Sequence, residues 1–368
     1  MELTFYLPTK VIMGKGCVEK KSALFKNYGK KALIITYPLD ENPALGDVTE
    51  ALGLQGISYE VIMDSPVNPD IADMDRLAKK AARAEADMIV GIGGGSALDT
   101  AKTIAVLCTN DIEPMKLYEN IFEKSPLPVI TIPTTAGTGS EVTPYSVLSI
   151  KEKDTKKSFG NEDQMSPVLA FLDARYTESM PHRISADSAV DALSHGLEGF
   201  MRKNGTWVSD MLGLTIFKNF ALCKKPLLSG DFDFNTRERL LYNACLSGIM
   251  INHARTLAVH AMGYELSLHR NLSHGCACGV LIGTFMEFVY PECSSKAERM
   301  YEALGVKDTS DFGQLISSIL NYEGTYTTDE IKRYTQACYK AALAKPNPIK
   351  MDKQTIFEIY KKALIDKT

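Results

Sequence analysis

The chain has 368 residues, a net charge of −4, an apolar fraction of 45% and a charged fraction of 23%. This length exceeds what one hydrophobic core usually supports, so we expect two domains. The mild negative charge gives no reason to expect nucleic acid or a membrane as a partner, and no apolar run reaches the roughly 18 residues of a membrane-spanning helix. The eight cysteines are scattered and the first residues lack a secretory signal, which predicts free thiols in a cytoplasmic protein.

The first half of the chain alternates short apolar runs with helical patterns. Residues 1–14 have the alternation of a strand, and residues 31–36, 58–63 and 87–91 are short apolar runs typical of strands covered on both faces. Residues 71–86 have helical spacing. This alternation predicts an α/β domain with a parallel sheet over residues 1–178.

A glycine-rich loop follows the run that ends near residue 91. Gly93, Gly94 and Gly95 lead into a predicted helix, with Ser96 as its expected N-cap and Asp99 as the capping-box partner. Consecutive glycines let backbone N–H groups approach an anion, and the helix N-terminus adds positive potential, so the loop suits the diphosphate of a dinucleotide. A tight turn is the alternative, and the glycine spacing differs from the standard dinucleotide fingerprint.

A second loop, rich in small hydroxyl residues, follows the apolar run before Pro133. Its residues Thr134, Thr135 and Thr138 can donate hydrogen bonds to phosphate or ribose oxygens, and its glycines keep the backbone near a ligand. A threonine-rich turn is the alternative interpretation. Beyond it we expect a strand at residues 146–150 and a hairpin turn at residues 151–157.

From residue 177 onwards nearly every segment has helical spacing, which predicts an all-helical domain over residues 179–368. Asp191 and His195 lie four residues apart and therefore on the same face of a helix. His260 and His274 follow in later polar clusters, although spacing alone does not choose between His253 and His260. One carboxylate and three imidazoles suit a divalent transition metal with open positions, whereas a hydrogen-bonded Asp–His pair without metal is the alternative.

Five motifs resemble those of the iron-containing (metal-dependent, group III) alcohol dehydrogenase family. GGGSALDTAK and PTTAGTGSE resemble its cofactor motifs, while DALSHGLE, VHAM and the His-Gly of NLSHGCACGV resemble its metal-binding motifs. The resemblance extends over nearly the whole chain. It implies a dehydroquinate synthase-like architecture, in which an α/β dinucleotide-binding domain precedes an all-α domain, and it implies a homodimer.

The resemblance also implies roles for individual residues. It assigns Asp191, His195, His260 and His274 to a metal, with Fe²⁺ the first expectation and Zn²⁺, Ni²⁺ or Co²⁺ as alternatives. It assigns the glycine loop, including Ser96 and Asp99, and the threonine loop to NADP or NAD. Lys157 is expected to reach the cofactor, with a charged turn residue as the alternative. The implied reaction is hydride transfer between nicotinamide C4 and a metal-bound primary alcohol or aldehyde, in the cleft between the domains.

Two positions depart from the family's pattern. Many members have a second histidine four residues after the ligand that matches His260, and here that position is Tyr264, which can relay a proton or be a core aromatic residue. Members that prefer NAD tend to carry an Asp directly after the first strand of the cofactor domain. In this chain the run ends at Tyr37 and Asp40 lies three residues later, which favours NADP and leaves NAD open.

Three other functions are considered. Glycerol dehydrogenase-like oxidation of a polyol is disfavoured by the third histidine, His274. A dehydroquinate synthase-like lyase needs several basic residues near the metal, and the chain offers few beyond Arg255, His269 and Arg270. A catalytically silent protein with a structural metal would have no use for an intact cofactor loop, and absence of cofactor binding would favour it.

Overall fold

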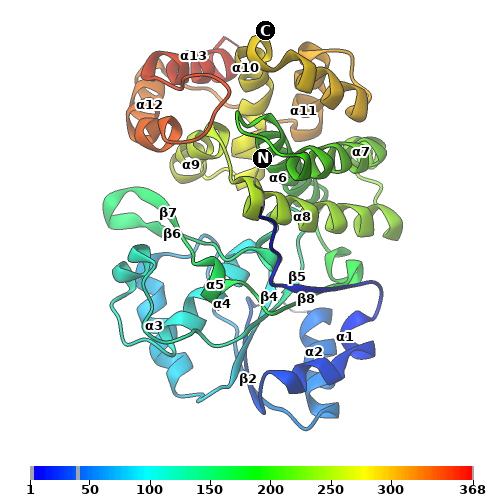
Figure 1. Cartoon of the computed structure of the whole chain (residues 1–368), viewed down its shortest axis with the longest axis vertical. Coiled ribbons are helices and arrows are strands. Elements are labelled where there is room, and N and C mark those ends of the chain that lie inside the picture. The colour runs from blue at the N-terminus through cyan, green and yellow to red at the C-terminus, as the bar shows by residue number, and fades with distance from the viewer. Residues whose placement is uncertain (1–3, 39–41, 367–368) are drawn as a thin grey trace. The chain divides into compact units, whose positions relative to one another are not determined.

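The structure, a computed structural model, describes residues 4–38 and 42–366 (Figure 1). These residues divide into two compact units, one spanning Tyr6–Ser179 and the other beginning at Met180. The first unit contains all the strands and the second contains only helices. The predicted boundary near residue 178 lies next to this division. Phe5 groups with the helical unit, where its ring makes an edge contact with that of His253, 5.9 Å between centroids.

The α/β unit is built on a six-stranded parallel sheet with the strand order β1-β8-β5-β4-β2-β3. Its strands are β1 (Lys10–Met13), β2 (Lys31–Ile35), β3 (Ser58–Ile62), β4 (Met88–Gly93), β5 (Val129–Pro133) and β8 (Leu169–Leu172). A separate antiparallel hairpin pairs β6 (Ser146–Ile150) with β7 (Thr155–Phe159). The apolar runs near residues 31, 58 and 87 therefore form neighbouring parallel strands, as expected from their composition.

The N-terminal segment differs from the strand predicted over residues 1–14. Residues 1–3 lie outside the described residues, residues 4–9 form no strand, and β1 begins only at Lys10. Pro8 lacks a backbone N–H and cannot donate to a ladder, which is consistent with this late start. From Lys10 onwards the segment pairs in parallel with β8.

Helices cover both faces of the sheet, because alternate residues of each strand point to opposite sides. From β2, Leu33 and Ile35 pack with α3 and α4, whereas Ala32 and Ile34 pack with α1 and α2. The helix α3 ends four residues earlier than its predicted limit. The helices of this unit are α1 (Cys17–Lys20), α2 (Pro43–Leu54), α3 (Ile71–Ala82), α4 (Gly95–Leu107) and α5 (Glu162–Met165), with 3₁₀ turns at Ser22–Asn27, Pro114–Glu119, Ser140–Val142, Lys151–Lys153 and Ala174–Thr177.

The chain leaves the neighbouring strands β2 and β4 toward opposite faces of the sheet. The helix α2 follows β2 and packs on one face, while α4 follows β4 and packs on the other. Open α/β sheets bind ligands at such a switch point, outside the carboxyl ends of the strands. The glycine loop after β4 and Tyr37 after β2 both lie at this position.

The second unit consists of eight helices among the residues described. In chain order these are α6 (His182–Met201), α7 (Trp207–Ser229), α8 (Phe234–Ala254), α9 (Ala258–Arg270), α10 (His274–Leu304), α11 (Thr309–Leu320), α12 (Thr328–Leu343) and α13 (Lys353–Leu364). The long helix α10 packs against α6, α7, α9, α11 and α13, and it bends at Cys293, two residues after Pro291.

The helix α10 is also long and apolar enough to cross a membrane by length and composition. Half of its most apolar window is buried within the protein, and the same test is passed by core helices of proteins that do not enter membranes. Its packing against five other helices is the environment of such a core helix.

All eight cysteines are free, as predicted.

Candidate cofactor loop and metal centre

The glycine loop makes its tightest turn at the end of β4. Gly93 has φ 148°, in the region that favours glycine. A Cβ placed there would lie 2.7 Å from the Cβ of Ala97 and 2.8 Å from the ring of Tyr37. The loop therefore excludes any side chain at Gly93 and brings the backbone close to Tyr37.

The helix after this loop begins two residues earlier than expected. Gly94 is the N-cap of α4, and no side chain in the described part of the protein caps the helix. Ser96 is the second residue of α4, and its Oγ accepts a hydrogen bond from the backbone N–H of Asn68 at 3.1 Å. The predicted N-cap at Ser96 is thus wrong. An uncapped N-terminus leaves N–H groups and positive potential for an anion.

The threonine loop packs directly on the glycine loop. A Cβ at Gly94 would lie 3.0 Å from Cγ2 of Thr135, and one at Gly95 would lie 2.8 Å from Cγ2 of Thr138. Thr134 follows β5, and its backbone N–H donates to the carbonyl oxygen of Gly93 at 3.0 Å. The two motifs that are about forty residues apart in the sequence therefore form one continuous loop surface. The hydroxyl of Thr134 also lies 3.0 Å from that of Tyr37.

Asp99 holds these two loops together rather than pairing with Ser96. Its Oδ1 accepts from the hydroxyl of Ser140 at 2.6 Å, and its Oδ2 accepts from the backbone N–H of Val147 at 2.9 Å. The capping-box role predicted for Asp99 is therefore wrong. Both carboxylate oxygens accept hydrogen bonds from the segment after the threonine loop. Asp99 therefore connects α4, which begins at the glycine loop, to that segment.

Lys102 is the buried cation of the same network. Its side chain is fully buried, and its Nζ lies 3.0 Å from Asp99 Oδ1 and 2.7 Å from the Oγ of Ser140. It also donates to the carbonyl oxygens of Ser140, Thr143 and Tyr145. Burial lowers the pKa of Lys102, and the charge of Asp99 opposes that shift. The ammonium ties α4 to the loop that follows β5.

Replacing Lys102 by Met is expected to destabilise the α/β unit. The change keeps the length of the side chain but leaves the Asp99 carboxylate and several carbonyl groups buried without their donor, a loss that costs about 3–5 kcal/mol. Urea unfolding would measure it. Lys79→Met, at an exposed lysine paired with Asp75 on α3, is the control and should change stability little. Equal effects of the two substitutions would contradict the role of Lys102.

The structure places Lys157 away from the glycine loop. Residues 155–159 form strand β7 rather than part of a turn, so consecutive lysines point to opposite sides. The Nζ of Lys157 lies over the ring of Tyr118, 4.8 Å from its centroid. The Nζ of Lys156 instead donates to Oδ1 of Asn68 at 3.0 Å, and Asn68 is hydrogen-bonded to Ser96. Lys156, and not Lys157, is thus the cation beside the cofactor loop.

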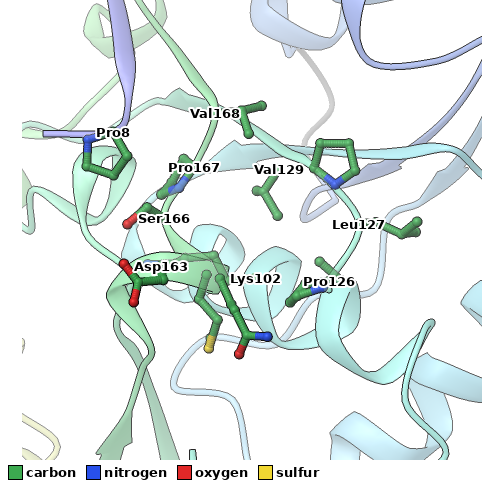
Figure 2. A pocket seen from close by; sticks show the side chains of 13 residues that line it. Pro8, Lys102, Pro126, Leu127, Val129, Asp163, Ser166, Pro167 and Val168 are labelled. Carbon is green, nitrogen blue, oxygen red and sulfur yellow. The ribbon is translucent and has the colours of Figure 1, made fainter. Parts of the chain in front are cut away.

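A cavity of about 220 Å³ in the α/β unit lies at a different edge of the sheet (Figure 2). Its walls include Leu127, Val129, Pro167 and Val168, which lie at or just before the first residues of β5 and β8. These are the amino ends of the strands, whereas the glycine loop follows the carboxyl end of β4. The cavity is therefore separate from the cofactor loop.

The four predicted metal ligands converge in the helical unit. Asp191 and His195 come from α6, His260 from α9 and His274 from α10. One ligand atom from each lies within 4.8 Å of the others. Asp191 Oδ1 is 3.9 Å from Nε2 of both His260 and His274, a spacing that bonds of about 2.0–2.2 Å to one ion allow.

The chemistry of the cluster fits a divalent cation. Asp191 Oδ1 and His260 Nε2 are buried and make no hydrogen bond among the described residues. Burial raises the pKa of Asp191 to about 6, and the neighbouring charge of His260 opposes that shift. Buried polar atoms are normally paired, so two orphaned atoms 3.9 Å apart suit a shared cation. One carboxylate and three imidazoles are the donor set of Fe²⁺, Zn²⁺, Ni²⁺ or Co²⁺.

A backbone contact places His274 in the cluster. A Cβ at Gly275 would lie 1.8 Å from the carbonyl oxygen of Asp187, so the first turn of α10 presses directly on α6. Ser273 is the N-cap of α10, and its hydroxyl donates to the carboxylate of Asp187. These two contacts fix the start of α10 against the helix that carries Asp191.

Gly275→Ala is expected to displace the start of α10 and to weaken metal binding by about ten-fold or more, as the loss of a supporting contact does in other metal sites. The affinity for Zn²⁺, measured by competition with a chromogenic chelator, is the test. Gly283→Ala, two turns further along α10, is the control, since its Cβ would meet only the Cα of Gly313 at 3.1 Å. Unchanged Zn²⁺ affinity in Gly275→Ala would contradict this role of the contact.

Tyr264 lies beside the cluster. It follows His260 by one turn of α9, and its ring stacks on that of His274, with 5.3 Å between centroids and 22° between planes. The structure therefore places Tyr264 next to the predicted metal ligands.

Sequence reasoning missed three residues of these sites. Tyr37 and Lys156 lie at the cofactor loop, and Glu198 contacts His260. The signal for Glu198 was present, because an acid seven residues after Asp191 on an apolar helix shares its face. Lys156 could have been found from the alternation of side chains in a strand, but we expected this segment to be a turn.

Few reactions use both a dinucleotide-binding loop and a metal centre of this kind. A cradle for a diphosphate binds a dinucleotide, and an ion held by three imidazoles and a carboxylate is a Lewis acid. The two together serve hydride transfer to and from a carbon that bears oxygen. The fold and sites thus define the class of metal-dependent oxidoreductases linked to a dinucleotide.

Comparison with known proteins identifies the family within this class. The family model described as "Iron-containing alcohol dehydrogenase" matches residues 8–174, and that described as "Fe-containing alcohol dehydrogenase family, C-terminal" matches residues 185–364. The chain therefore belongs to the iron-containing alcohol dehydrogenase family. The predictions of this family, of the fold class and of an alcohol dehydrogenase are confirmed.

Individual relatives agree with this assignment. The chain is 32% identical to long-chain-alcohol dehydrogenase 1 of Geobacillus thermodenitrificans, over 80% of this chain and 75% of the relative. It is 31% identical to sulfoacetaldehyde reductase of Bilophila wadsworthia, over 75% and 72% respectively. The crystal structure of an iron-containing alcohol dehydrogenase from Thermotoga maritima superposes with a TM-score of 0.91 at 32% identity, covering 99% of both chains.

Proposed function

We propose that this alcohol dehydrogenase interconverts a primary alcohol and its aldehyde, with Fe²⁺ at the Asp/His₃ cluster and NADP at the glycine loop. The observation that carries the proposal is the convergence of Asp191, His195, His260 and His274 within 4.8 Å in a chain that also has a cofactor loop. When bound, the metal ion would polarise the substrate oxygen as a Lewis acid, and the nicotinamide would exchange a hydride at C4.

The chain's own residues bind and orient these groups. The four ligands hold the ion, and the contact at Gly275 keeps His274 in place. The N–H groups at the start of α4 bind the diphosphate, and Lys156 adds a positive charge beside them. Asp99 and Lys102 keep the threonine loop against the glycine loop.

Tyr264 is proposed to relay the proton that accompanies hydride transfer. Its support is the stacking of its ring on His274, which brings the residue next to the metal cluster. A tyrosine hydroxyl can both donate and accept a hydrogen bond, so it can pass a proton between substrate and solvent.

The proposed preference for NADP over NAD rests on the residues that directly follow β2. Tyr37 occupies the position next to Gly93 at the switch point, and no acidic side chain follows the strand directly. A carboxylate there would repel a 2′-phosphate, so its absence from residues 36–38 favours NADP. Asp40, the nearest acid, lies outside the described residues.

The substrate class is proposed from family membership. Relatives of similar identity are named for a long-chain alcohol and for sulfoacetaldehyde, so we keep the class at primary alcohols and aldehydes. We further propose that the protein is cytoplasmic and has no nucleic-acid or membrane partner, supported by its free cysteines and mild net charge. The proposal that it is a homodimer rests on the family resemblance alone.

The proposed function predicts that protein purified without oxygen contains about one metal ion per chain and reduces short aldehydes with NADPH faster than with NADH. In His260→Ala both the bound metal and the activity should be lost, because one of four ligands is removed. Metal analysis and initial rates with both cofactors are the measurements. Stoichiometric metal without cofactor binding or turnover would contradict the proposal and favour a structural metal.

Lys156→Ala is expected to raise the dissociation constant of the cofactor about 10- to 100-fold, because a hydrogen bond to a charged group contributes about 1.5–3 kcal/mol. Lys157→Ala is the matched control, one residue further along the same strand, and should leave that constant within about two-fold. Fluorescence titration with NADPH and NADH would measure both variants. A larger effect of Lys157→Ala than of Lys156→Ala would contradict the placement of Lys156 beside the cofactor and favour the assignment of Lys157 that the family resemblance implies.

A further inference from the structure

Glu198 is a buried carboxylate that has no role in the function proposed above. It lies on α6, seven residues after Asp191 and three after His195, so the three side chains share one face of the helix. Its Oε2 is hydrogen-bonded to Nδ1 of His260, and its Oε1 accepts from the backbone N–H of His260 at 3.3 Å. The side chain of Glu198 is 0% exposed. Both of its oxygens are therefore used by a single residue.

The geometry places this carboxylate as an acceptor, because Oε1 faces the backbone N–H of His260 and Oε2 faces its Nδ1. The N–H of His260 belongs to the first turn of α9, where the helix dipole attracts negative charge. An accepting carboxylate requires that Nδ1 of His260 carry the proton, because a neutral imidazole has one donor and one acceptor nitrogen. The lone pair is then on Nε2.

The other ring nitrogen points into the metal cluster. Nε2 of His260 is buried, makes no hydrogen bond among the described residues, and lies 3.9 Å from Asp191 Oδ1. The ring of His260 also stacks on that of His195, with 4.3 Å between centroids. The tautomer with its proton on Nδ1 is thus the one that leaves Nε2 able to bind a cation on this side.

We propose that Glu198 is a positioning residue of the metal centre. It fixes the tautomer and the ring orientation of His260 and makes Nε2 a stronger donor to the ion. The inference rests on the proposed function in one respect, namely that the cluster formed by Asp191, His195, His260 and His274 binds a metal.

A helix cap alone would explain the same contact to the backbone, and the chain contains a matched control for it. The N-cap Leu257 provides no side-chain hydrogen bond to α9. Oδ1 of the buried Asn347 accepts from the backbone N–H of Ala258 at 2.9 Å, so Asn347 caps the same turn without contacting a histidine. Removing Asn347 tests the loss of a cap, and altering Glu198 tests the cap together with the ring contact.

The first experiment measures the affinity of the full chain for Zn²⁺ by competition with a chromogenic chelator. Glu198→Gln is isosteric, but its amide oxygen can accept only one of the two N–H groups of His260, so we expect 10- to 100-fold weaker binding. Asn347→Ala should lower the melting temperature and leave Zn²⁺ affinity within about two-fold. Glu198→Asp keeps the charge and should recover part of the loss. Equal Zn²⁺ affinity of wild type and Glu198→Gln, or equal losses in Glu198→Gln and Asn347→Ala, would overturn the proposal.

A second measurement uses the wild-type protein and does not depend on a variant that folds. In metal-free protein with ¹⁵N-labelled histidine, the Nδ1 resonance of His260 should be that of a protonated nitrogen and the Nε2 resonance that of an unprotonated one. The opposite tautomer would overturn the role of Glu198. Failure of wild-type protein to bind Zn²⁺ would instead count against the proposed function, while the tautomer would still test Glu198.

Discussion

The metal centre depends on the contact between the backbones of α6 and α10. Gly275 has no room for a Cβ because the carbonyl oxygen of Asp187 occupies its place, and this brings the first residue of α10 next to Asp191. The hydroxyl of Ser273 binds the carboxylate of Asp187 and reinforces the same contact. Because the contact is between main chains, it fixes the separation of the two backbones that carry Asp191 and His274.

A buried charge has the same organising effect in the α/β unit. Lys102 and Asp99 connect α4 to the segment after β5 through bonds to backbone and hydroxyl groups. The glycine loop at one end of α4 and the threonine loop are thus held as one rigid surface. In both units a few buried polar contacts fix the loops and helix ends that face a ligand. Surface ion pairs such as Lys79–Asp75 have no such role.

Much of this arrangement could be predicted from the sequence, and the failures have physical reasons. Short apolar runs predicted the parallel strands, and the motifs around Asp191 and His274 predicted which side chains would meet. Lys157 was expected at the cofactor from the family resemblance, within a segment, residues 151–157, that was interpreted as a turn. The turn in fact ends at Asp154, with φ 47°, and the strand that follows reverses the direction of alternate side chains. Hydrogen bonds of Asp99 to residues more than forty positions away have no local sequence signal.

The distribution of the metal ligands has a consequence for how the protein matures. Asp191, His260 and His274 lie on three helices, and the nascent chain brings none of these helices together until the helical unit has folded. Because such a site is rarely preformed in an unfolded chain, we expect metal binding to be coupled to the folding of this unit. Since nitrogen and oxygen donors bind Zn²⁺ and Cu²⁺ more tightly than Fe²⁺, the donor set does not select iron. Selection among these ions must therefore come from the geometry of the site and from the ions that are available in the cell.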